Sequence, residues 1–193
     1  MLGALPKSLE IGGVEYPINA DFRNIFPIFA AFSDSGLTDQ EKLYVCMERL
    51  FVDLDSLPKE QYTAAYQAAL DFLAAGRHDE NPGPRVVNWE KDEQMIFSAV
   101  NQVAGVPEVR DLPFLHWWTF LGYFMAIDSE SLCASVLRIR QKRAKHKKLE
   151  KYEEEFYRAN KDLCAVEPKK RKERPEDSLA AMFDELVAEG GGG

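Results

Sequence analysis

PFLHWWTFLGYFMAI, residues 113–127, is the segment that says most about the fold class. Its side chains are apolar at nearly every position. A helix that is apolar all the way round is buried on every side, so these residues predict a helix inside a helical core. The stretch is shorter than the ~20 residues that a bilayer crossing requires, and it holds His116 and Thr119. We therefore expect a mainly α-helical fold and no membrane segment.

Signals for further helices lie upstream. Thr38 and Glu41 have the spacing of a capping box ahead of apolar residues at helical intervals. Pro58 stands at a first-turn position of a second helical pattern. Asn88 can cap a helix that starts at Trp89, and Gly105 is a suitable stop for it. The apolar stripes of these helices predict a common core.

The N-terminal residues have a different periodicity. Residues 8–18, SLEIGGVEYPI, alternate apolar and polar on each side of Gly12-Gly13, and two glycines supply the positive φ angles of a tight hairpin turn. A two-stranded hairpin buries too little to stand alone and must pack on helices. We predict one globular helical domain over residues 1–140 that includes this hairpin. Its last helix is expected to bury Leu132, Val136 and Ile139.

Residues 141–165 are rich in charged, helix-forming side chains and predict one extended charged helix. Some of its apolar residues repeat at steps of three and four, the spacing of a coiled-coil seam. They are Leu149, Tyr152, Phe156, Ala159 and Leu163. Lys142 and Lys145 interrupt the register upstream, so a homo-oligomer is left open.

Residues 166–193 predict a flexible basic linker, a short amphipathic helix and a glycine tail. The helix would present an apolar face of Leu179, Met182, Phe183, Leu186 and Val187. A helix of about ten residues is not stable alone in water. Its apolar face must therefore dock on its own domain, on another copy or in a partner's groove.

Charge is distributed unevenly along the chain. Residues 1–137 carry 9 basic and 20 acidic side chains (−11), residues 138–174 carry 15 and 7 (+8), and residues 175–193 carry 0 and 5 (−5). Residues 138–148 are the most basic part and admit a nucleic-acid-binding or packaging role. Glu150, Glu153, Glu154 and Glu155 follow within one or two turns, however, and permit ion pairs along the helix, such as Lys151 with Glu155. A solvated helix face or a docking face for an acidic protein is the favoured interpretation.

The sequence holds no pattern that points to catalysis. There is no phosphate-binding glycine loop, no nucleophile elbow and no His or Cys cluster with metal-ligand spacing, so we expect no enzyme, no cofactor and no metal. His116 is predicted to be a hydrogen-bonded core or helix-rim residue and not a catalytic one. The three cysteines lack CxxC spacing and suit a reducing cytoplasm, and no signal peptide is indicated.

Three blocks of the chain resemble the bacteriophage gene product 15 family of long-tailed phages. They are NWEKDEQMIFSAVNQVAG, LHWWTFLGYF and LRIRQKRAKHKKLEKYEEEFYRANKDL. The resemblance covers residues from about 5 to 165 and rests most on the HWW triplet followed by the IRxK step. It implies a tail assembly chaperone of the host cytoplasm that is absent from the mature virion.

The partner that the resemblance implies is the tape-measure protein, with the major tail protein as a second candidate. Membrane and nucleic-acid partners are not expected. Such a chaperone would cover an aggregation-prone helical client with amphipathic helices. We therefore assign partner binding to the apolar residues of the two C-terminal segments. They are Leu149, Tyr152, Phe156, Leu179, Met182, Phe183, Leu186 and Val187.

Overall fold

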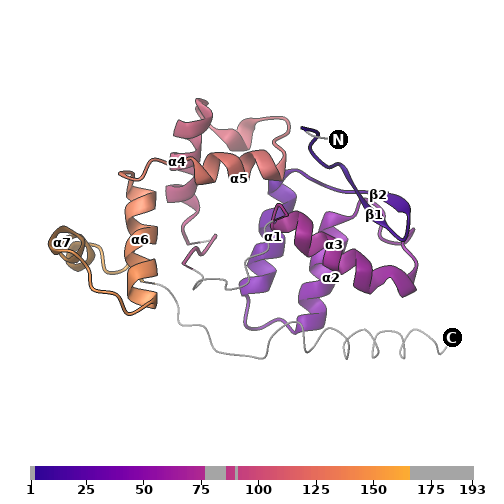
Figure 1. The fold of residues 1–193 in the computed structure, drawn as a ribbon, viewed down its shortest axis with the longest axis horizontal. Coiled ribbons are helices and arrows are strands. Elements are labelled where there is room, and N and C mark those ends of the chain that lie inside the picture. Colours follow the sequence, from indigo (N-terminus) through magenta and orange to yellow (C-terminus); the bar gives the residue numbers. More distant parts are fainter. Residues whose placement is uncertain (1–2, 77–85, 90, 166–193) are drawn as a thin grey trace. The chain divides into compact units, whose positions relative to one another are not determined.

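A computed structural model describes residues 3–76, 86–89 and 91–165 (Figure 1). These residues form a mainly helical fold with one small antiparallel hairpin, as predicted. Contacts divide them into two compact units, which we call unit 1 (residues 3–76 and 116–118) and unit 2 (residues 86–89, 91–115 and 119–165). The predicted linker and helix of residues 166–193 lie outside the described residues.

The hairpin opens unit 1. Strand β1 (Ser8–Ile11) pairs antiparallel with β2 (Val14–Pro17), with Leu9 opposite Tyr16. Gly12 and Gly13 have φ angles of +60° and +83°, which is the left-handed conformation that the two-residue turn needs. Ile11 is buried at the turn, whereas its partner Val14 is exposed. The hairpin therefore faces the core with part of its apolar surface only.

Three helices complete unit 1: α1 (Phe22–Ser33), α2 (Asp39–Leu50) and α3 (Tyr62–Leu73), the last preceded by a 3-10 turn at Lys59–Gln61. Asp21 caps α1, and the helix continues through Pro27. The predicted capping box of α2 is confirmed, because Thr38 and Glu41 each accept a hydrogen bond from the other's backbone N–H.

The HWW triplet belongs to unit 1. Trp117 is 1% exposed, contacts the ring of Phe29 and donates its indole N–H to the Leu73 carbonyl at 3.0 Å. His116 is hydrogen-bonded, as predicted, and of the two predicted positions it takes the core one: Nε2 lies 2.8 Å from the Pro6 carbonyl, and Nδ1 accepts the Trp118 N–H at 3.0 Å. The triplet thereby ties the N-terminal segment and the end of α3 together.

Unit 2 contains α4 (Glu93–Ala104), most of α5 (Trp117–Met125), α6 (Leu132–Ala144) and α7 (Lys151–Ala159), with a 3-10 turn at Val109–Asp111. Gly105 ends α4 in the left-handed conformation, as predicted. The start of α4 was predicted at Trp89, but the helix begins four residues later. Apolar residues from α4, α5 and α6 fill the interior: Ile96, Phe97, Val100, Phe120, Val136 and Ile139.

The prediction of an all-round buried helix over 113–127 is wrong in two respects. The helix starts only at Trp117, because the His116 side chain accepts the Trp118 N–H and so satisfies a helix-terminal donor. Phe114 precedes it and is 53% exposed, and Met125 at its end is 52% exposed. Leu132 was also expected in the core, but it is exposed in the first turn of α6, after the cap at Ser131.

The single charged helix predicted for 141–165 is wrong as well. Helix α6 ends at Ala144, His146 takes a left-handed φ of +53°, and α7 begins at Lys151. Glu150 and Glu153 form a capping box that starts the new helix. Because the helix is interrupted between α6 and α7, the Glu153 side chain on α7 reaches Lys142 on α6. In the described part of the chain, no helix is long and apolar enough to cross a membrane.

Candidate partner-binding site

The α6–α7 surface holds the described residues to which the sequence assigns partner binding. Tyr152 and Phe156 lie on α7 and line a small hollow together with Ser135, Ile139 and other residues of the two helices. Tyr152 is 55% exposed and Phe156 is half-buried. Leu149 is half-buried in the connection before α7. The structure therefore brings Tyr152 and Phe156 to one place, but the helical seam that would add Leu149 and Leu163 does not form.

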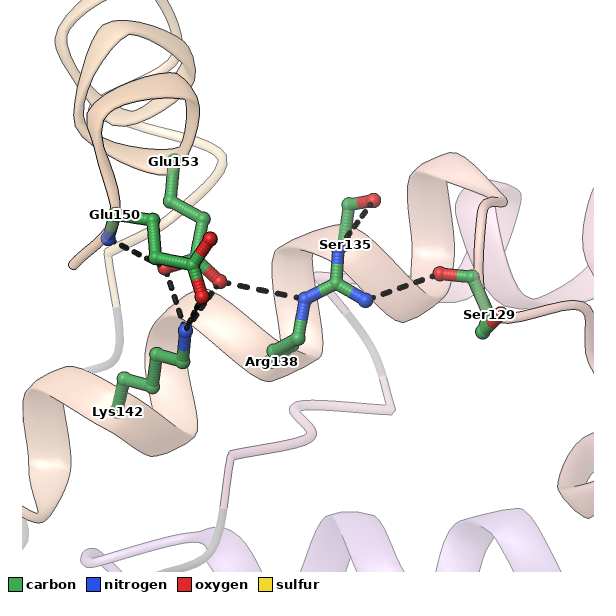
Figure 2. Close-up of polar contacts among 6 residues, drawn as sticks. All are labelled: Ser129, Ser135, Arg138, Lys142, Glu150 and Glu153. Atoms are coloured by element: carbon green, nitrogen blue, oxygen red, sulfur yellow. Dashed lines mark hydrogen bonds and ion pairs between the residues drawn. The ribbon is translucent and has the colours of Figure 1, made fainter.

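Glu153 holds α7 to α6 (Figure 2). Its carboxylate is only 1% exposed and accepts two hydrogen bonds of 2.7 Å from Lys142 Nζ. Arg138 Nε lies 3.4 Å from the same carboxylate. The backbone N–H of Glu150 donates a further hydrogen bond of 2.9 Å to Oε2. One buried carboxylate thus joins two cations of α6 to the first turn of α7.

The electrostatics of this cluster favour the ionised form of Glu153. Burial by itself raises the pKa of a carboxyl group, but the hydrogen bonds from Lys142 and Glu150 and the charge of Arg138 outweigh it. The pKa of Glu153 therefore lies below its ordinary value of 4.5. Hydrogen bonding to Glu153 likewise raises the pKa of Lys142. Near neutral pH, both groups are charged and the attachment of α7 is at full strength.

A second buried ion pair joins α6 to neighbouring segments of unit 2. The Arg140 guanidinium makes a bidentate contact with the Asp92 carboxylate, with Nη2 to Oδ1 at 2.8 Å, and both side chains are almost fully buried. Arg140 also donates to the carbonyl of Val86 at 2.8 Å and to that of Leu163 at 2.6 Å. It therefore connects the residues before α4 and after α7 to α6.

These contacts change the interpretation of the basic segment 138–148. Arg138 and Lys142 pair with Glu153, Arg140 pairs with Asp92, and the Arg143 guanidinium lies 4.1 Å from the centre of the Tyr157 ring. The remaining basic residues are Lys145, Lys147 and Lys148, which are exposed at the end of α6 and in the connection. Four of the seven cations thus support the fold of unit 2, and a continuous phosphate-binding stripe does not form on α6.

Sequence reasoning allowed Glu153 an ion pair along one helix, but it did not predict that Glu153 and Asp92 are buried and join separate segments of the chain. The described residues bring no three His, Cys, Asp or Glu side chains together as a metal site would require. The five tail residues assigned to partner binding, Leu179, Met182, Phe183, Leu186 and Val187, lie outside the described residues. The α6–α7 surface thus exposes Tyr152 beside a buried ionic cluster.

Comparison with known protein families identifies the family of this chain. The family model described as bacteriophage Gp15 protein matches residues 1–166. The chain belongs to this family. The Gp15 match spans both units and the α6–α7 surface, and it indicates a phage structural or assembly protein. Searches of the curated proteins and of the solved structures find no significant match.

Proposed function

We propose that this Gp15-family chain is a tail assembly chaperone that binds the tape-measure protein and keeps it soluble while the tail tube forms. The observation that carries the proposal is the α6–α7 surface of a phage-family protein. It exposes Tyr152 and Leu132, each more than half exposed, beside the hollow that Phe156 lines. We propose that the chain acts in the host cytoplasm, without catalysis, and is not retained in the virion.

The physical requirement on such a chaperone is reversible cover for a long apolar helix. A helical client has apolar side chains at steps of three and four residues, and a groove between two helices accepts such a row. Aromatic residues provide large contact area with few rotatable bonds, so Tyr152 and Phe156 suit this role. A small surface gives modest affinity, which allows tube subunits to displace the chaperone.

The basic character of the same surface supports a protein client. The lysines exposed at the end of α6 and in the connection to α7, Lys145, Lys147 and Lys148, can attract acidic residues that flank the client's apolar row. The tail residues Leu179, Met182, Phe183, Leu186 and Val187 would add a second apolar face for the client. The tape-measure protein is the first partner in this proposal, and the major tail protein is the second.

Co-expression tests the proposal. The tape-measure protein of the same phage is produced in bacteria with and without this chain, and its soluble fraction is measured after centrifugation. We expect it to be soluble only when the chain is present, and to co-purify with it. A tape-measure protein that stays insoluble in both cultures would contradict the proposal. Retention of the chain on DNA that weakens steeply with salt would instead favour the packaging role of residues 138–148.

A further inference from the structure

We propose that the hollow between α6 and α7 binds the chain's own C-terminal segment, residues 176–189. The inference concerns the isolated protein and does not rest on the identity of any client. It follows from three properties: the apolar surface at the hollow, the opposite charges of the two segments, and the length of chain between them.

The first property is an apolar surface that lacks cover among the described residues. Tyr152 is 55% exposed and Leu132 is 53% exposed, although both are large apolar or aromatic side chains. Leu132, Ser135 and Ile139 follow one another on α6 at steps of three and four, so they share a face. Ser135 and Ile139 line the hollow with Tyr152 and Phe156. The face of α6 thus continues from the hollow to exposed Leu132.

The C-terminal segment has an apolar face of matching length. Leu179, Met182, Phe183, Leu186 and Val187 span nine residues. As a helix these would extend about 13 Å, the same as the nine residues of α7, Lys151–Ala159. A helix this short needs a partner surface to form. Docking in the hollow would supply that surface and would cover Tyr152 and Leu132 at the same time.

Opposite net charges favour the C-terminal segment as the occupant of the hollow. Residues 132–165 carry ten basic and five acidic side chains, a net charge of +5, and Asp92 neutralises one of the cations, Arg140. Residues 175–193 carry five acidic side chains and no basic one, a net charge of −5. Asp184 and Glu185 lie between the apolar positions of the segment in the sequence, and Lys145 and Lys147 are exposed at the end of α6, so docking would bring unlike charges together.

The chain between Ala165 and the C-terminal segment is long enough for the segment to reach the hollow. Thirteen residues, 166–178, separate the end of the described chain from Leu179. Fully extended they span roughly 43 Å, several times the length of α7. A tether of this size gives a local concentration on the order of millimolar, so even a weak contact is well populated.

A disulfide-trapping experiment on the full chain tests the inference. One variant carries Tyr152→Cys with Phe183→Cys, and the matched control carries Tyr44→Cys with Phe183→Cys. Tyr44 is 62% exposed and lies on α2 of unit 1. The native cysteines Cys46, Cys133 and Cys164 are buried and should not interfere. Under mild oxidation we expect the first pair to close within one molecule about tenfold faster than the control.

Charge is tested separately from apolar contact. Adding Asp184→Lys and Glu185→Lys to the Tyr152→Cys and Phe183→Cys pair leaves the apolar face intact, and we expect closure to slow toward the control rate. Equal rates for the two cysteine pairs would overturn the inference. A disulfide that forms only between two molecules would also overturn it, because a second copy would then occupy the hollow.

Hydrogen exchange gives a readout that leaves the hollow unaltered. In the full chain, Phe183→Asp should speed exchange of the α7 amides, whereas Phe183→Leu should leave it unchanged. Unchanged exchange of the α7 amides in both variants would contradict docking. Because neither variant carries a substitution in α6 or α7, the result would not reflect damage to the hollow itself.

Discussion

Unit 1 and unit 2 are both helical, but different chemistry fills their interiors. The most buried residues of unit 1 are apolar or aromatic: Phe22, Ile25, Ile28, Met47, Leu50 and Trp117. Unit 2 buries three charged side chains, Asp92, Arg140 and Glu153, each 1% exposed. Unit 1 is thus stabilised mainly by apolar area, while the helices of unit 2 are joined in addition by two buried ionic contacts.

This difference matters for how each unit responds to change. Apolar contacts are non-directional, so their loss is graded with the area removed. A buried ion pair recovers its desolvation cost only in the right geometry, and removal of one partner leaves an uncompensated charge. The attachment of α7 is therefore expected to be more sensitive to charge than unit 1 is.

The largest effect that separates the units is expected for Arg140→Ala. It leaves Asp92 buried without its bidentate partner and removes the hydrogen bonds to Val86 and Leu163. We expect a loss of about 3–5 kcal/mol from the free energy of unfolding of unit 2. Urea unfolding followed by hydrogen exchange of α3 and α6 measures the two units separately.

The control for this change removes both charges. Arg140→Met together with Asp92→Leu leaves no buried ion, so it should recover a substantial part of the lost stability. A double variant as unstable as Arg140→Ala would show that the carbonyl contacts, and not the ion pair, carry the effect.

A smaller effect is expected for Glu153→Gln. The amide can still accept the Glu150 N–H but loses the charge that binds Lys142 and Arg138, at a cost of about 2 kcal/mol to the attachment of α7. In the native protein the pKa of Glu153 is lowered on folding, so its contribution is complete above the ordinary value of 4.5 and is lost as the pH falls through the folded value.

Amide exchange of α7 between pH 7 and pH 3, corrected for intrinsic rates, measures this contribution. The difference between wild type and Glu153→Gln should shrink as the pH falls, while α2 behaves alike in both proteins. A difference that persists unchanged at pH 3 would mean that the Glu153 charge does not hold α7.

The smallest effect is expected for Thr38→Ala in unit 1. It removes the side chain that caps α2 and accepts the Glu41 N–H at 3.2 Å, at a cost of about 1 kcal/mol. Because the lost hydrogen bond joins the uncharged Thr38 hydroxyl to a backbone N–H, the cost should depend little on salt. Thermal melts at low and high salt check this, and a loss of several kcal/mol would contradict a purely local cap.

Features fixed by neighbouring residues were predictable from the sequence. The Gly12-Gly13 turn, the Thr38 capping box and the Gly105 stop each depend on a few adjacent positions. The break between α6 and α7 was not predicted, because Lys145, Lys147 and Lys148 are good helix formers and no proline or glycine marks the end. Tertiary contacts of Glu153 outweigh that local preference.

The site was predictable only in part for the same reason. Tyr152 and Phe156 stood out as apolar residues in a charged segment, and the structure places both at the hollow. Arg140 looked like one cation of a basic stripe, because its partner Asp92 lies 48 residues earlier in the chain. No local pattern connects such a pair, so the sequence could not show which charges are buried.

The most direct test of the proposed chaperone role compares Tyr152→Asp with Tyr44→Asp in the co-expression experiment. Both tyrosines are more than half exposed, one at the α6–α7 hollow and one on unit 1. We expect the tape-measure protein to become insoluble with Tyr152→Asp and to remain soluble with Tyr44→Asp. A tape-measure protein that is equally soluble with both variants, or insoluble even with the wild-type chain, would contradict a client site on α6–α7.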